Sequence, residues 1–333
     1  MKKLLILCLS ILSFVAADAY EYKRQITVAQ DGTGDCKTLA EAMEYIRAYM
    51  DYPCTVNIRN GVYREKVIVP SWLENVEFVG ENRDSTIIVW GDHANMPWPG
   101  LGKFEKMGTF RTFTVRVDGS DITFRNLTIQ NDAPRAGQAV ALHTEGDRLA
   151  FYNCNILGNQ DTIFTGGLNT RLFFEDCYID GTTDFIFGPA TAVFRDCMIV
   201  SKVNSYVTAA STPKGVRVGY VFDGCTLRPT ETAEKVYLGR PWRPYAHTAF
   251  INCDLGGHIA PAGWHNWGKA DNEQTARYEE YGNRGEGAST EARAPWARQL
   301  TAAEAAALTD LDFVFTTHDK WHPASSRELK IKN

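Results

Sequence analysis

The sequence has no excess of positive charge and no low-complexity tract. Its 333 residues include 35 Lys and Arg against 40 Asp and Glu, a net charge of −5. Because nucleic-acid-binding domains usually carry a basic excess or stripe, this balance argues against a nucleic-acid partner. The chain is 44% hydrophobic and 23% charged, which is ordinary for a globular protein and excludes a mainly disordered one.

Long hydrophobic runs are also absent, apart from one at the start of the chain. Lys2-Lys3 precede an apolar run over residues 4–17, and Ala17-Asp18-Ala19 supplies a small-x-small cleavage site. The run is too short for a membrane span and polar sequence follows it, so it indicates a signal peptide. We therefore expect a leader over residues 1–19, secretion or export to the periplasm, and a single domain over residues 20–333, monomeric and free of the membrane.

Several catalytic signatures are missing as well. The sequence has no Gly-x-Ser-x-Gly and no His-Glu-x-x-His motif, which argues against the usual serine hydrolases and zinc hydrolases. Gly32-Thr33-Gly34 lacks the third glycine of a nucleotide-binding loop and indicates only a turn. We expect neither a metal nor another cofactor.

A repeat of short apolar segments fills the middle of the chain. Each segment follows the pattern apolar-x-Phe-x-x-Cys/Leu-x-apolar, and its phenylalanine recurs every 20 to 28 residues. The two halves alternate in polarity and predict short strands with one buried face, joined by a polar pair such as Arg125-Asn126. Such units bury that face only when coil stacks on coil, so we predict an all-β fold, a parallel β-helix. The segments span residues 122–129, 149–156, 172–179, 192–199, 220–227 and 248–255.

Seven cysteines follow residue 19, an odd number that cannot pair completely. Five of them share one position in successive repeats: Cys154, Cys177, Cys197, Cys225 and Cys253. A ladder of disulfides or metal ions would use this arrangement, but the zinc spacing Cys-x-x-Cys is missing. Free cysteine is among the most buried residue types, so we interpret the five as an internal stack of free thiols.

Both ends of the repeat carry signatures of capping segments. Thr38 and Glu41 form a capping box before an amphipathic run over residues 39–50, which predicts a helix that closes the first coil. Thr301 begins the same signature before an alanine-rich helix. We expect residues 278–298 to form a long loop packed along the outside of the coils.

Two aspartates stand in register with the repeat. Asp161 lies seven residues after Cys154, and Asp184 lies seven residues after Cys177. Equal offsets in adjacent coils predict two carboxylates about 5 Å apart, one strand spacing. Like charges so close raise one pKa and lower the other, which produces an acid beside a base or nucleophile. The alternative is a pair of loop aspartates that only cap turns.

Two glutamines favour the catalytic interpretation. Gln160 precedes Asp161, and Gln138 falls on the preceding coil. Side-chain amides near a carboxylate pair suit hydrogen bonding to an oxyanion. This combination favours acyl chemistry over glycoside cleavage, for which a close carboxylate pair would otherwise fit a retaining hydrolase.

Three blocks of sequence resemble the signature blocks of the pectin methylesterase (pectinesterase) family. They are Gly158-Asn159-Gln160-Asp161-Thr162, Gly181-Thr182-Thr183-Asp184-Phe185-Ile186-Phe187-Gly188 and Leu238-Gly239-Arg240-Pro241-Trp242. The similarity extends over about residues 26–300. It implies a right-handed parallel β-helix that removes methyl groups from the C6 carboxyl of galacturonate units in homogalacturonan and releases methanol.

The resemblance also implies a role for each residue of the site. Asp184 would be the nucleophile that forms an acyl-enzyme, and Asp161 would act first as general acid and then as general base. Gln138 and Gln160 would hold the oxyanion. Arg240 would orient Asp184 and keep it ionised, since an adjacent positive charge is expected to lower the pKa of a carboxyl.

Five further residues match family positions along the sugar-binding cleft: Trp242, Phe187, Thr109, Phe164 and Tyr245. Packing within the core is the alternative for Phe187. Phe164 stands where the family commonly has tyrosine, so a hydrogen bond from that hydroxyl is absent here.

Two rival functions remain open from sequence alone. The first is another polygalacturonate-active β-helix enzyme, a lyase or glycoside hydrolase, and the second is a non-catalytic carbohydrate-binding β-helix. Chain shortening of pectin would support the first, whereas the complete set of site residues argues against the second. We interpret Trp264 and Trp267 as structural residues of a tryptophan-rich turn.

Overall fold

A computed structural model describes residues 22–98, 105–230, 232–315 and 319–323. The predicted leader over residues 1–19 lies outside these residues. Within the described part of the chain, every helix is too short or too polar to cross a membrane.

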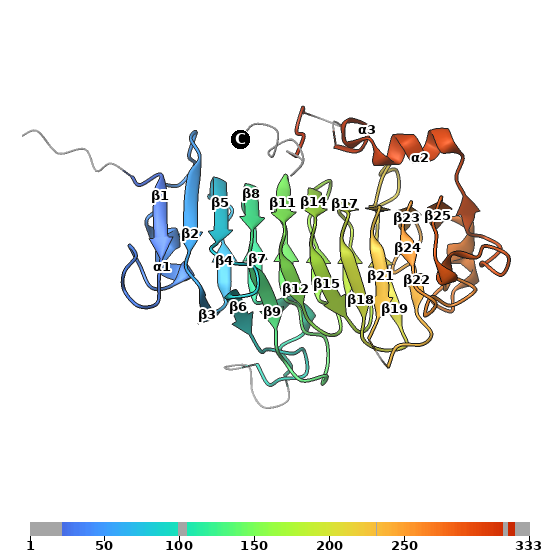
Figure 1. The fold of residues 1–333 in the computed structure, drawn as a ribbon, viewed down its shortest axis with the longest axis horizontal. Helices are drawn as coiled ribbons and strands as arrows, with labels where there is room; N and C mark the ends of the chain where they lie inside the picture. Colours follow the sequence, from blue (N-terminus) through green and yellow to red (C-terminus); the bar gives the residue numbers. More distant parts are fainter. Residues whose placement is uncertain (1–21, 99–104, 231, 316–318, 324–333) are drawn as a thin grey trace, which may run out of the picture.

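The described residues wind into a parallel β-helix with three sheets, and the coils stack along the long axis of the molecule (Figure 1). Every pair of neighbouring strands is parallel, and each coil in the middle of the molecule contributes one strand to each sheet. Sheet A contains, in spatial order, β1 (Gln25–Val28), β2 (Cys54–Ile58), β5 (Glu74–Gly80), β8 (Ser120–Arg125), β11 (Leu149–Tyr152), β14 (Arg171–Glu175), β17 (Thr191–Arg195), β20 (Tyr220–Asp223), β23 (His247–Ile251), β25 (Arg277–Tyr281) and β26 (Arg298–Gln299). Sheet B contains β3 (Gly61–Arg64), β6 (Thr86–Trp90), β9 (Thr128–Asn131), β12 (Asn155–Leu157), β15 (Tyr178–Gly181), β18 (Met198–Ser201), β21 (Thr226–Pro229) and β24 (Asp254–Leu255). Sheet C contains β4 (Val67–Val69), β7 (Val115–Val117), β10 (Leu142–Thr144), β13 (Ile163–Thr165), β16 (Ile186–Gly188), β19 (Tyr206–Ala210) and β22 (Tyr237–Gly239).

The repeated phenylalanines form one continuous stack inside the coils. Neighbouring ring centroids lie 4.3 to 5.2 Å apart, and their planes are nearly parallel. This distance matches the spacing of about 4.8 Å between adjacent strands. The repeat therefore predicts the architecture correctly, and the stack extends one coil further than the pattern indicated, to Phe78.

A left-handed residue turns the chain from sheet A into sheet B in the coils from Phe124 to Phe250, and in the Phe222 coil it is Gly224, with φ of 66°. The backbone φ at this corner lies between 48° and 56° at Asn126, Asn153, Asp176, Asp196 and Asn252. Asn and Asp tolerate this conformation better than most residues because their short polar side chains can hydrogen-bond locally. The polar pair that joins the half-strands is therefore the corner of the coil.

All seven cysteines in the described residues are free and buried. In the stack of five, each thiol donates to the carbonyl oxygen of a phenylalanine one coil earlier, at 3.2 to 3.6 Å. Burial raises the pKa of Cys154, Cys177, Cys197 and Cys225 well above the ordinary value of a thiol. The prediction of a stack of free thiols is confirmed.

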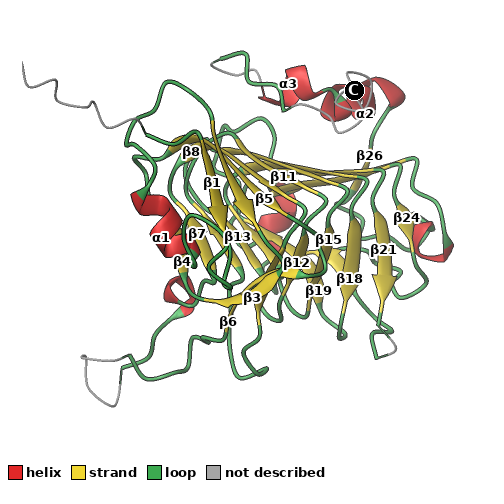
Figure 2. Ribbon diagram, turned by 60° about the vertical axis from the view of Figure 1, so that its left-hand side comes forward, coloured by secondary structure: helices red, strands yellow, loops and turns green. Residues whose placement is uncertain are grey.

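A short helix, α1 (Leu39–Glu44), covers the N-terminal end of the solenoid, whereas the two helices near the C-terminus lie along the side of the coils (Figure 2). The capping box at Thr38 is present, but helix α1 is shorter than the predicted run to residue 50. Tyr49 interrupts that run because its φ is 53° and its amide donates to the carbonyl of Trp72 at 2.9 Å. The 3₁₀ turns in the described residues are η1 (Thr109–Arg111), η2 (Ala270–Gln274) and η3 (Glu286–Ala288).

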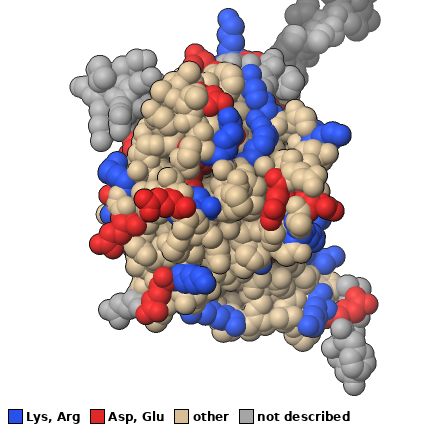
Figure 3. Space-filling model, turned by 90° about the vertical axis from the view of Figure 1, so that its right-hand side faces the viewer, with Lys and Arg blue, Asp and Glu red and all other residues tan. Residues whose placement is uncertain are grey.

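The segment expected as a loop over residues 278–298 begins and ends in strands instead. Tyr278 belongs to β25, which extends sheet A, and Arg298 begins β26. The buried Tyr278 ring packs on Trp264 at 4.4 Å, so this stretch closes the last coil. Viewed from this end, charged side chains of both signs surround a mainly uncharged centre (Figure 3).

The C-terminal segment packs outside the coils, as predicted. Helices α2 (Ala302–Thr309) and α3 (Leu311–Phe315) cover the outer face of sheet A, where Leu308 and Phe315 join an apolar cluster with residues such as Phe173. Arg171 fastens the segment, because its guanidinium donates to Asp319 at 2.6 Å and to the Phe315 carbonyl at 2.7 Å.

Replacing Phe174 by Ala should lower the free energy of unfolding by about 3–5 kcal/mol. The ring is fully buried between two stacked neighbours, so its removal leaves a cavity in the middle of the stack. Chemical denaturation measures the loss. Leu168→Ala, at a residue that is 75% exposed, is the control and should change stability by less than about 0.5 kcal/mol. Equal losses in the two variants would contradict the contribution of the phenylalanine stack to stability.

Candidate active site

The two aspartates lie at the corner where the chain passes from sheet B into sheet C. Asp161 stands just before β13 and Asp184 just before β16, and these strands pair Ile163 with Ile186. The Asp161 amide donates to the Thr183 carbonyl at 3.1 Å, which continues the same register. The equal offsets from the repeat therefore do bring the two residues onto neighbouring coils.

Both aspartates have left-handed backbones, with φ of 66° at Asp161 and 49° at Asp184. This conformation is uncommon for residues other than glycine, and it is found where a side chain must be presented from a sharp turn. The neighbouring coil fixes it, because the Asp184 amide donates to the Tyr206 carbonyl at 2.9 Å. Both side chains consequently belong to rigid corners.

Arg240 binds Asp184 with two parallel hydrogen bonds. Its Nε donates to Oδ1 at 2.9 Å and its Nη2 donates to Oδ2 at 2.6 Å. The guanidinium lies between two aromatic rings, 3.9 Å from the centroid of Tyr206 and 3.7 Å from that of Trp267. Bidentate pairing and stacking together fix the direction of the Asp184 carboxylate.

The two carboxyls differ in their electrostatic surroundings. Burial raises the pKa of Asp161 well above its ordinary range, and the adjacent Asp184 raises it further. Burial also raises the pKa of Asp184, while the hydrogen bonds and charge of Arg240 act in the opposite direction. The expected lowering of the Asp184 pKa is therefore wrong in sign, because desolvation exceeds the effect of Arg240. The order of the two carboxyls remains, because the pKa of Asp161 is raised more strongly than that of Asp184.

A cavity of about 270 Å³ opens above the pair. Asp161 and Asp184 form part of its lining together with Gln138, Gln160 and Arg240. The five residues predicted for catalysis are thus brought together around one space. Their individual roles remain predictions.

The residues predicted to bind sugar divide into two groups. Trp242, Phe187 and Thr109 line the cavity. Phe164 is buried outside this lining, with its ring 4.9 Å from that of Phe187, and Tyr245 also lies outside the lining.

Three cavity residues were missed or misinterpreted in the sequence. Phe110 and Ala209 line the cavity without belonging to any recognised motif. Trp267 also lines it and stacks on Arg240, so its interpretation as structural is wrong. Trp264 is structural, since it is buried and its indole donates to Glu280 at 3.0 Å. Phe187 and Ala209 are paired neighbours on adjacent strands of sheet C and both line the cavity. This pairing depends on the register between the strands, which sequence alone does not reveal.

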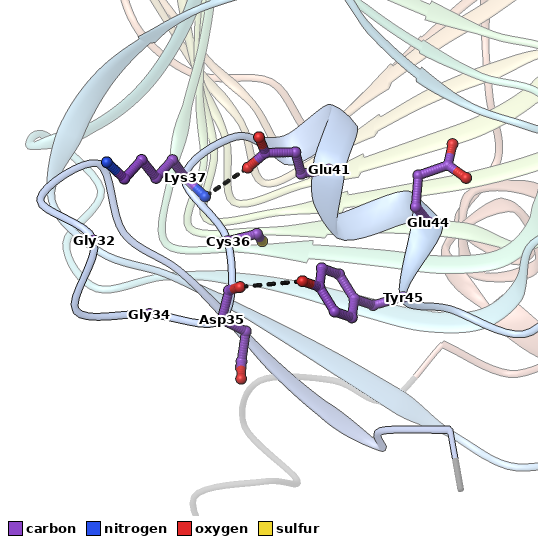
Figure 4. Close-up of a pocket in the computed structure, with 8 residues that line it drawn as sticks. All are labelled: Gly32, Gly34, Asp35, Cys36, Lys37, Glu41, Glu44 and Tyr45. Carbon is purple, nitrogen blue, oxygen red and sulfur yellow. Dashed lines mark hydrogen bonds between the residues drawn. The ribbon is translucent and has the colours of Figure 1, made fainter. Parts of the chain in front are cut away.

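A larger hollow of about 620 Å³ lies beside α1, and its lining shares no residue with the cavity at the aspartate pair (Figure 4). Two of its three acidic lining residues, all but Glu44, already bind the local backbone. Glu41 accepts from the amides of Lys37 and Thr38, and Asp35 accepts from the amide of Thr27. The hollow therefore has no pair of carboxyls available for catalysis among its described lining residues. Nor does any group of three or more His, Cys, Asp or Glu in the described residues form a metal site.

Fold and site together define a class of protein, a parallel β-helix with a buried pair of carboxyls beside an open cavity. Comparison with known proteins identifies the family. The Pectinesterase family model matches residues 25–317, and the chain belongs to this family of carboxylic ester hydrolases.

Individual relatives agree with this assignment. Pectinesterase 31 of Arabidopsis thaliana is 34% identical over 300 residues, which cover 89% of this chain and 94% of that protein. Pectin methylesterase from carrot has a TM-score of 0.80 at 34% identity, with 87% of this chain and 92% of that chain covered. Pectin methylesterase PemA from Erwinia chrysanthemi has a TM-score of 0.76 at 29% identity, with 92% and 99% covered. The fold is therefore the right-handed parallel β-helix of the pectin methylesterases. The chain spans 54% of a longer Arabidopsis relative named a probable pectinesterase/pectinesterase inhibitor.

Replacing Asp161 by Asn should stabilise the fold near neutral pH. In the unfolded chain the Asp161 carboxyl ionises near its ordinary pKa of 3.8, whereas burial raises the pKa in the folded state. The contribution of Asp161 to stability is therefore fully present below the ordinary pKa and is lost as pH rises toward the native pKa. The loss is about 1.4 kcal/mol for each tenfold difference in acid dissociation constant between the folded and unfolded states. Asn removes this loss and tolerates the left-handed backbone.

Melting temperatures of the wild type and the Asp161→Asn variant, measured near pH 4 and near pH 7, test the prediction. The advantage of the variant should grow with pH. Asp176→Asn is a matched control, because Asp176 is exposed and has the same left-handed backbone. A difference between wild type and Asp161→Asn that does not change with pH would contradict the raised pKa.

Proposed function

We propose that this pectinesterase removes methyl groups from the C6 carboxyl of galacturonate units in homogalacturonan, through an acyl-enzyme on Asp184. The observation that carries the proposal is the pair of stacked carboxyls, of which Asp184 is held by Arg240 in a bidentate geometry. Membership of the family supports the reaction. A related pectin methylesterase has been crystallised with a hexasaccharide, which supports an extended sugar chain as the substrate.

In the first half of the reaction, Asp184 attacks the carbonyl carbon of the methyl ester. The carbonyl oxygen becomes an oxyanion, to which the amides of Gln138 and Gln160 donate hydrogen bonds. As the tetrahedral intermediate collapses, the carbon–methoxy bond breaks and Asp161 gives its proton to the leaving group. Methanol departs, and an anhydride joins Asp184 to the substrate.

In the second half, a water molecule resolves the anhydride. Asp161, now ionised, accepts a proton from the water, which attacks the substrate carbonyl. Asp184 leaves as a carboxylate, and the galacturonate product loses a proton to solvent at neutral pH. Splitting the hydrolysis into two steps is ordinary covalent catalysis, and the net result is methanol and acidification without cleavage of the polysaccharide.

The cavity walls suit an esterified sugar. Trp242, Phe187 and Trp267 supply apolar faces around the two aspartates, and aromatic faces pack well on the apolar side of a pyranose ring. Thr109, the first residue of η1, also lines the cavity. We propose these residues as the binding surface nearest the reacting ester, with Phe164 supporting Phe187 from beneath and Tyr245 further along the sugar chain.

We also propose that the enzyme works outside the cytoplasm, as a single catalytic domain over residues 20–333. Two observations support this: residues 1–19 have the layout of an export signal, and the proposed substrate is a cell-wall polymer.

Replacing Asp184 by Asn should abolish methanol release. The amide is a far weaker nucleophile, so we expect kcat to fall by about 10³-fold or more. Purified protein on methyl-esterified pectin is assayed for methanol and for new reducing ends or unsaturated products. Asp176→Asn is the control and should retain activity. New chain ends from the wild type, or near-normal methanol release from Asp184→Asn, would overturn the proposal.

Activity should fall as pH drops through the native pKa of Asp184, because attack requires the ionised carboxylate. That pKa lies above its ordinary value of 3.8. Arg240→Gln removes the opposing positive charge, so the pKa should rise further and the acid limb of the kcat profile should move to higher pH.

The control for this prediction is Arg59→Gln. Arg59 forms an exposed ion pair with Glu81 at 3.1 Å, and such pairs contribute about 0–1 kcal/mol to stability. Its pH profile should match the wild type. An acid limb that stays in place in Arg240→Gln would show that Arg240 does not set the ionisation of Asp184.

A further inference from the structure

The turn over residues 158–162 determines the geometry of the site, because it carries both Gln160 and Asp161. Asp161 is in a left-handed conformation, with φ of 66°. Its carboxyl is faced by Asp184 and Arg240. A small displacement of the turn would therefore move an oxyanion donor and the acid/base together.

An ion pair from the next two coils holds the start of this turn. Oδ1 of Asp180, on β15, accepts from the Gly158 amide at 3.0 Å. Lys202, just after β18, places its Nζ 2.8 Å from the same Oδ1 and donates to the Gly158 carbonyl at 2.8 Å. Both backbone groups of Gly158 are thus bound to side chains of the pair.

The backbone of Asp180 holds the end of the turn, and that of Lys202 is bound in turn to the coil of Asp180. The Thr162 hydroxyl donates to the Asp180 carbonyl at 3.0 Å, and the Lys202 amide donates to the Gly181 carbonyl at 2.9 Å. The three residues lie on successive coils. Gly158 directly follows β12, Asp180 belongs to β15, and Lys202 directly follows β18. The pair therefore links the turn to two coils that lie beyond it in the stack.

The pair is well shielded from water, with side-chain exposures of 10% at Asp180 and 22% at Lys202. A shielded ion pair contributes little net stability, because desolvation of both charges offsets their attraction. Such a pair can instead select one conformation among several. Here the selected conformation is that of the turn before β13.

We propose that the Asp180–Lys202 pair is a positioning device that holds Gln160 and Asp161 against Asp184. The proposal rests on the roles given above to these three residues. Neither Asp180 nor Lys202 reaches the cavity lining, so both act through the turn. A misplacement of about 1 Å in a catalytic group can lower the rate by about 10²-fold, which is the size of effect to expect.

The test compares Lys202→Met with Lys235→Met, the same substitution at an exposed lysine. The double variant Asp180→Asn/Lys202→Met removes the buried carboxylate that the single variant leaves without its cation, while Asn keeps an acceptor for the Gly158 amide. Methanol release is followed well below each melting temperature, across the full pH range. We expect kcat to fall by about 10- to 100-fold in both Lys202 variants with little change in KM, whereas Lys235→Met matches the wild type.

The basic limb of the pH profile separates positioning from a simple charge effect. That limb reports deprotonation of Asp161, and a loosened turn would hydrate this carboxyl and move the limb to lower pH. Loss of the Lys202 charge alone would move it to higher pH. The double variant should recover melting temperature but not kcat.

A fall in melting temperature alone, with wild-type kcat and an unchanged basic limb, overturns the positioning proposal. So does a shift of the limb to higher pH. These outcomes are distinct from failure of the proposed function, which would appear as methanol release by Asp184→Asn whatever the Lys202 variants do.

Discussion

The bidentate contact between Arg240 and Asp184 is the interaction on which the site depends. Two carboxyls on adjacent coils are chemically alike until something makes them unequal. Arg240 donates two hydrogen bonds to Asp184, whereas burial and the neighbouring charge raise the pKa of Asp161. We propose that the proton belongs to Asp161, so that the pair divides into the nucleophile and the acid that ester hydrolysis needs.

The stacking of coils makes this contact possible. The interior repeats at the strand spacing, as the rings from Phe78 to Phe250 show. Each coil therefore presents its corner residues at the same position around the solenoid axis as the neighbouring coils do. Corner positions with left-handed backbones are costly, and the hydrogen bonds of the next coil keep them in place. Rigidity of the scaffold is thus transferred directly to Asp161 and Asp184.

Much of the fold followed from local pattern, because a solenoid is built from contacts between successive repeats. The spacing of the phenylalanines, the polar corner pairs and the capping boxes at Thr38 and Thr301 each reflect one coil or one turn of helix. The errors fell where a distant contact overrode local preference. Residues 278–298 looked like a loop, yet β25 extends sheet A against β23.

The sequence by itself determined the stacked coils, the aspartate pair and its two amide neighbours, since equal offsets within a repeat become vertical alignment. Tertiary structure decided the electrostatics and the walls of the cleft. The pKa of Asp184 depends on a balance between desolvation and Arg240 that no spacing encodes. Trp267 and Ala209 reach the cavity from other coils, and the Asp180–Lys202 pair contacts the turn that carries Asp161. Only the register between strands brings these residues together.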